Sequence, residues 1–123
     1  MENTWWSAGT RLAIWTALVA ALSLLPFRMK HALGTHGPWH DAGHLGAFAI
    51  TAWLFLAWHG PPRTALWRLW PVIAFALVLE WLEAAPFGNP FEWGDVRVDS
   101  LGTLAAWLAY WLYAKPAGRS SDT

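Results

Sequence analysis

The chain has 123 residues, of which 56% are hydrophobic and only 13% are charged, and its formal net charge at pH 7 is zero. This length corresponds to one domain, and a zero net charge gives no electrostatic basis for binding nucleic acid. The absence of cysteine excludes disulfides and thiolate metal sites.

Four apolar segments follow one another along the chain, and each is predicted to form a helix. They cover residues 10–27, 42–58, 66–85 and 100–114, with prolines at or just beyond their ends. Pro71 falls in the first turns of the third segment, where a helix tolerates proline. The first segment has a weakly basic start and no small-residue cleavage site after it, so a retained helix is predicted there, not a signal peptide.

The pattern favours an integral membrane four-helix bundle over a soluble one. A soluble bundle would carry a polar stripe on every helix. Residues 45–58, however, contain only Thr51 as a polar group apart from tryptophan. Mean hydropathy is only +0.29, because that scale scores tryptophan as polar. Many of the tryptophans stand near segment ends, as in an aromatic belt. The predicted fold class is therefore all-α, with residues 1–115 as one four-span domain embedded in the lipid bilayer and residues 116–123 as a short polar tail.

The distribution of lysine and arginine predicts the orientation. With four spans, the two termini and the second connection share one side, which carries five of these residues, whereas the opposite side carries three. The positive-inside rule then places both termini in the cytoplasm. On this topology the outer half holds four of the five histidines and most of the acidic residues, namely Asp41, Glu80, Glu83, Glu92, Asp95 and Asp99.

The third segment places two carboxylates in an apolar helix. Glu80 and Glu83 are three residues apart and so share one helical face. A charge at the bilayer centre costs about 2.5–3.5 kcal/mol on insertion scales, so Glu80 needs a partner or water. Arg97 is the only basic residue in the third connection and is the predicted counter-ion.

Two further motifs lie at the starts of the second and fourth segments. Asp41 is predicted to be an N-cap with His44 in the following turn. Asp95 and Asp99 are four residues apart and are expected to share a face, although capping alone would also account for one of them. Gly102 and Ala106 form a small-xxx-small pair that would allow close approach of another helix.

Taken together, these motifs resemble the VanZ-like family of small bacterial membrane proteins. The family pattern has an Asp shortly before a His-Phe pair, then Glu-x-x-Gln, an Arg, and Asp-x-x-x-Asn-x-x-Gly opening the last helix. This chain has Asp41 with His44-Leu45, then Glu80-x-x-Glu83, then Asp95-x-x-x-Asp99-x-x-Gly102, and Asn89 stands near the place of the Arg. The resemblance covers roughly residues 10–115. It implies four spans, a location in the cell envelope and a link to resistance against teicoplanin-type glycopeptides.

The first functional hypothesis is an outward-facing polar site that binds a lipid-linked or cell-wall ligand. An intramembrane metal-dependent hydrolase is one alternative, although the chain has no HExxH-like motif and only His44 is well placed as a ligand. A small proton-linked transporter using Glu80 is another, and it would need a homo-oligomer. The same side chains could also serve only to lock the helices together. No cofactor or metal is assigned, and enzymatic activity is left open. The predicted site residues are Asp41, His44, Glu80, Glu83, Asp95, Arg97 and Asp99.

Overall fold

The computed structural model describes residues 7–25, 38–59, 66–88 and 90–114, and most of these residues are helical. The helices are α1 (Ala8–Ser23), α3 (Pro38–His59), α4 (Trp70–Ala84) and α5 (Trp93–Ala114). Short 3-10 turns precede and follow α4 as η2 (Leu66–Leu69) and η3 (Ala85–Phe87). The predicted all-α fold class is thus confirmed for the part of the chain that the structure describes.

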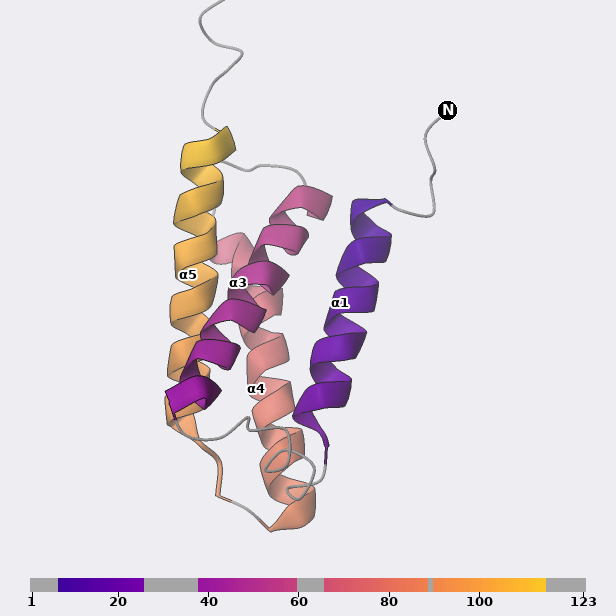
Figure 1. The fold of residues 1–123 in the computed structure, drawn as a ribbon, viewed down its shortest axis with the longest axis vertical. Helices are drawn as coiled ribbons and strands as arrows, with labels where there is room; N and C mark the ends of the chain where they lie inside the picture. The colour runs from indigo at the N-terminus through magenta and orange to yellow at the C-terminus, as the bar shows by residue number, and fades with distance from the viewer. Residues whose placement is uncertain (1–6, 26–37, 60–65, 89, 115–123) are drawn as a thin grey trace, which may run out of the picture.

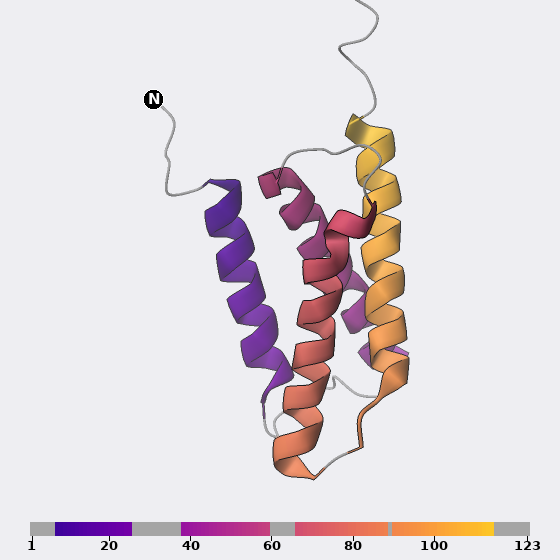
Figure 2. The same ribbon diagram turned by 180° about the vertical axis from the view of Figure 1, so that it is seen from behind.

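The four helices form a bundle in which successive helices run in opposite directions (Figure 1). As a consequence α3 and α5 are parallel, and the views from front and back both place them side by side (Figure 2). They share the most extensive contact between any two helices of the bundle. The lower end in Figure 1 holds the start of α3, the start of α5 and the end of α4, and it is called the polar end below.

Local chemistry sets the helix starts, and three of them, those of α1, α3 and α5, come earlier than predicted. Ser7 caps α1, because its hydroxyl oxygen accepts the Thr10 backbone N–H at 3.2 Å. Helix α3 begins at Pro38, whose missing N–H costs nothing in a first turn. The predicted N-cap role of Asp41 is therefore wrong, since this residue lies within the first turn of α3. Asp95 likewise lies in the first turn of α5, where a negative charge interacts favourably with the helix dipole.

The core runs along the bundle between the helices. A hydrogen bond within it joins α1 to α3, because Trp15 Nε1 donates to Thr51 Oγ1 at 2.9 Å. The Thr51 hydroxyl in turn donates to the Ala47 carbonyl at 2.7 Å, so this buried hydroxyl is satisfied. The buried apolar side chains that pack together in this core are Val19, Phe48, Ala52, Leu56, Leu69, Val72, Ala76, Leu79 and Ala106.

The contact between α3 and α5 is close enough to require a glycine. A Cβ at Gly102 would collide with the backbone carbonyl of Leu45 and would press on the backbone of Ala49. One turn further along α5, Ala106 is buried. Small residues therefore let the two backbones approach one another, as small-xxx-small pairs do in other helix pairs.

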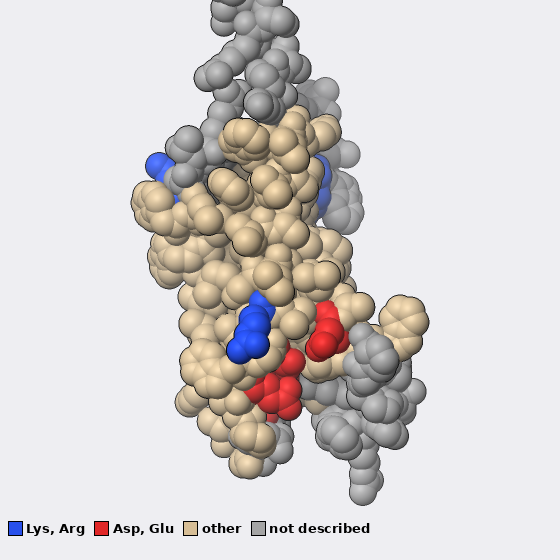
Figure 3. Space-filling model, turned by 90° about the vertical axis from the view of Figure 1, so that its left-hand side faces the viewer, with Lys and Arg blue, Asp and Glu red and all other residues tan. Residues whose placement is uncertain are grey.

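The outer surface of the bundle is also largely apolar. In Figure 3 the acidic groups visible on this face lie in its lower half, and the area above them is mostly uncharged. Exposed aliphatic side chains include Ile14, Leu18, Leu22, Ile50, Val78, Leu101, Leu104, Leu108 and Leu112. Over the residues that the structure describes, none of the helices has both the length and the mean hydropathy that crossing a membrane requires.

Replacing Gly102 by alanine is expected to destabilise the fold by about 1–3 kcal/mol, the usual cost of overpacking a tight contact. Gly46→Ala in α3 is the matched control, because a Cβ there meets nothing within 4 Å. Removing a helical glycine at an open position should be neutral or slightly stabilising. Thermal unfolding of both variants in detergent measures the difference, and equal melting temperatures would contradict the close approach of α3 and α5.

Candidate functional site

Two histidine–aspartate pairs join α3 to α5 at the polar end. His40 Nε2 lies 3.1 Å and 3.2 Å from the two carboxylate oxygens of Asp95. His44 Nδ1 lies 2.7 Å from Asp99 Oδ1. Both pairs have the same sequence separation of 55 residues. The two histidines and the two aspartates are each four residues apart, so on parallel helices both pairs can form one turn apart.

The two pairs are also connected to each other. His44 Nε2 lies 3.7 Å from Asp95 Oδ2, and the ring centroids of His40 and His44 are 4.5 Å apart. The carboxylates lie deepest, since the exposed fraction of the side chain is 4% for Asp99 and 9% for Asp95 against 34% for His40. Asp95 therefore faces two imidazoles from a largely buried position.

The hydrogen bond from His44 to Asp99 leaves the other ring nitrogen of His44 facing a second carboxylate. An ionised carboxylate only accepts hydrogen bonds, so Asp99 accepts the Nδ1–H of His44. The other ring nitrogen, Nε2, then faces Asp95, which is again an acceptor. Two facing acceptors repel each other unless a positive charge lies between them. A proton shared between the two groups or a metal ion would remove this repulsion.

Glu80 and Glu92 extend this group of side chains toward α4. Glu80 is buried, and its Oε1 accepts the backbone N–H of Glu92 at 2.8 Å. Carboxylate oxygens of Glu80, Glu92 and Asp95 lie within 4.8 Å of one another. Partial burial and the negative charge of Asp95 raise the pKa of Glu92 above its ordinary value. The polar cluster is defined as His40, His44, Glu80, Glu92, Asp95 and Asp99.

The structure brings together four of the predicted site residues, namely His44, Glu80, Asp95 and Asp99. Asp41 is exposed and takes no part in the hydrogen bonds that define the cluster. Glu83 is partly buried and lines a neighbouring pocket instead.

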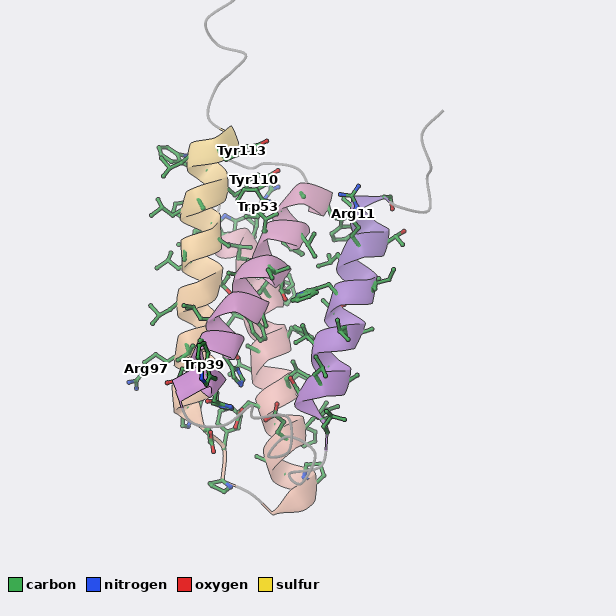
Figure 4. All side chains as sticks on the ribbon, in the orientation of Figure 1. Arg11, Trp39, Trp53, Arg97, Tyr110 and Tyr113 are labelled. Carbon is green, nitrogen blue, oxygen red and sulfur yellow. The ribbon has the colours of Figure 1, made fainter. Side chains whose placement is uncertain are left out.

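The predicted counter-ion role of Arg97 is wrong. Its side chain is exposed and points away from the bundle (Figure 4). Arg97 is two residues from both Asp95 and Asp99 along α5, which turns it to a different face of the helix. Within the described residues the imidazoles of His40 and His44 pair with the aspartates, and a backbone N–H binds Glu80.

His40 belongs to the cluster but is absent from the site residues that the sequence predicts. The sequence does contain a signal for it, because the four-residue spacing of His40 and His44 equals that of Asp95 and Asp99. Two such spacings meet only if their helices are parallel and in register. The sequence alone does not supply that register.

An apolar pocket of about 230 Å³ lies beside the cluster, lined by residues of α1, α3 and α4. His40, His44 and Glu83 contribute polar side chains to a lining that is otherwise mostly apolar. The imidazoles therefore contact the aspartates and also face the pocket. The apolar part of the lining comes mainly from Trp15, Leu18, Val19, Leu22, Leu25, Trp39, Ala47 and Phe48.

Comparison with known proteins finds no family model, no curated protein and no solved structure that matches this chain. The resemblance to the VanZ-like family stays a prediction, and function has to be inferred from the site itself.

Proposed function

We propose that this chain is a VanZ-like multi-pass protein of the bacterial cytoplasmic membrane that binds an amphiphilic ligand at its polar end. The observation that carries the proposal is the pocket in which apolar walls meet His40, His44 and Glu83. A ligand with a hydrocarbon part and a polar headgroup matches this combination. The link to glycopeptide resistance remains a prediction from the resemblance alone.

The length of two of the helices and the surface of the bundle support a membrane location. Helices α3 and α5 have 22 residues each, which corresponds to about 33 Å, against about 30 Å for a bilayer core. Exposed aliphatic side chains surround the bundle, where a soluble bundle would expose polar ones. Exposed aromatic residues stand at both ends, as in two interfacial belts. They are Trp39, Trp81 and Trp93 in the half that contains the polar end, and Trp58, Trp67, Trp70 and Tyr113 toward the other end.

Charge supports the orientation. Among the described basic residues, Arg11 and Arg68 lie toward the end opposite the polar end, and Arg97 lies at the polar end. The rule that basic residues stay in the cytoplasm then turns the polar end outward. The polar cluster would accordingly face the cell wall.

Reporter fusions test this orientation. Alkaline phosphatase fused after Thr123 should be inactive, because the C-terminus is predicted to be cytoplasmic. The same enzyme inserted between residues 34 and 37 should be active. The reverse pattern would refute the orientation, and activity independent of the fusion site would argue against a four-span topology.

The lining of the pocket favours a hydroxyl-rich headgroup. Carboxylate and imidazole groups exchange hydrogen bonds readily with hydroxyls, whereas the apolar walls would hold part of a lipid chain. A lipid-linked sugar of the cell envelope combines both features. A transport path finds less support, because the described core above the cluster holds no buried ionisable side chain, and its buried polar residues are Thr51 and Thr103.

Filling the pocket should prevent ligand binding. A Cβ added at either Gly43 or Gly46 would meet open space, but only Gly43 lines the pocket. Gly43→Leu should therefore abolish most of the labelling by an alkyl glycoside that carries a photoreactive group in its chain, with the protein reconstituted in nanodiscs. Mass spectrometry of the cross-linked wild-type chain should find the label on α1 and α3.

Gly46→Leu is the matched control and should be labelled like the wild type. Equal labelling of all three proteins, or labels confined to residues outside the pocket, would overturn the proposed ligand site. A change in melting temperature shared by both variants would reveal a general effect of the added side chain on folding.

A further inference from the structure

We infer that His40, His44 and Asp95 form a binding site for one divalent transition-metal ion. Each of the three residues offers a ligand atom, and these atoms lie within 4.8 Å of one another. The donors are two imidazole nitrogens and one carboxylate oxygen. Imidazole donors favour zinc, iron and related ions over magnesium and calcium, which prefer oxygen ligands.

The distances between the donors suit a metal ion. Bonds of about 2.0–2.2 Å in tetrahedral geometry hold neighbouring ligand atoms roughly 3.3–3.6 Å apart. Asp95 Oδ2 lies 3.2 Å from His40 Nε2 and 3.7 Å from His44 Nε2, on either side of this range. An ion would thus need only small side-chain adjustments.

Asp99 contacts the ring nitrogen of His44 that points away from the proposed metal ion. A metal-bound histidine usually donates its other ring N–H to a carboxylate, which fixes the tautomer and orients the ring. The 2.7 Å contact between His44 Nδ1 and Asp99 is such a contact, and it directs Nε2 toward Asp95. Asp99 is therefore a positioning residue for the site and not a ligand.

The charges of the cluster also favour a divalent cation. The cluster contains the four carboxyl groups of Glu80, Glu92, Asp95 and Asp99 but only two imidazoles. Burying unpaired charge is costly, so protons or a metal ion must supply the balance. An ion between the imidazoles would also replace the repulsion between Nε2 of His44 and Asp95.

Zinc binding by the untagged full-length chain in detergent tests the site. After removal of metal with a chelator, titration with Zn²⁺ should show one ion bound per chain. Asp95→Asn should abolish this binding, and Asp99→Ala should weaken it about 10–100-fold, as loss of an orienting carboxylate does elsewhere. Asp41→Asn is the control, because Asp41 adjoins His40 in sequence but is exposed and outside the cluster; its affinity should be unchanged.

Nitrogen-15 NMR of the wild-type histidines gives a second readout that does not depend on the folding of any variant. Zinc should shift the Nε2 resonances of two histidines, while Nδ1 of His44 stays protonated. The spectra of His40→Gln and His44→Gln each lack the resonances of one histidine, which assigns the two shifted signals. Absence of zinc binding, equal binding by Asp95→Asn, or shifts confined to other histidines would overturn the inference. These measurements need no lipid, so their outcome is independent of the amphiphile experiment.

Discussion

The parallel packing of α3 against α5 is the constraint on which the polar end depends. Gly102 lets the α5 backbone lie against Leu45, and this contact sets the position of one helix along the axis of the other. In that register His40 faces Asp95 and His44 faces Asp99. A slip by one helical turn would leave only one histidine opposite an aspartate. The backbone contact at Gly102 and the histidine–aspartate pairs therefore specify the same register of α3 and α5. Mutually consistent contacts of this kind are typical of sequences that specify one fold.

The polar pairs are too buried to be treated as surface salt bridges. Removing one partner of a buried ion pair costs about 3–5 kcal/mol, because the other charge remains in a poorly solvated place. The cluster nevertheless contains more carboxylates than imidazoles, which is an inefficient way to hold helices together. An excess of acidic groups beside a pocket is better explained by a bound cation or ligand than by helix locking alone. The proposed ligand and metal sites share His40 and His44, so both would use one polar end.

Much of the fold is predictable because it follows from local patterns. Four long apolar segments with prolines near their ends predict four helices, and a fixed up-and-down order gathers the acidic residues at one end. Helix starts are less predictable. The polar residues before Ser100 predict a connection, whereas α5 already begins at Trp93. The side-chain partners are hardest to predict, since Arg97 and Asp99 are close in sequence but face different directions.

A double-mutant cycle on His44 and Asp99 tests the central claim that α3 and α5 are joined by these side chains. Unfolding free energies of His44→Gln, Asp99→Asn and the double variant would be measured in detergent with a chelator present. A buried hydrogen bond between charged groups predicts a coupling energy of about 1–3 kcal/mol. The pair Asp41 and Asp99 serves as the reference and should show little coupling, because Asp41 is exposed and lies outside the cluster. Additive effects of the His44 and Asp99 substitutions would contradict the account.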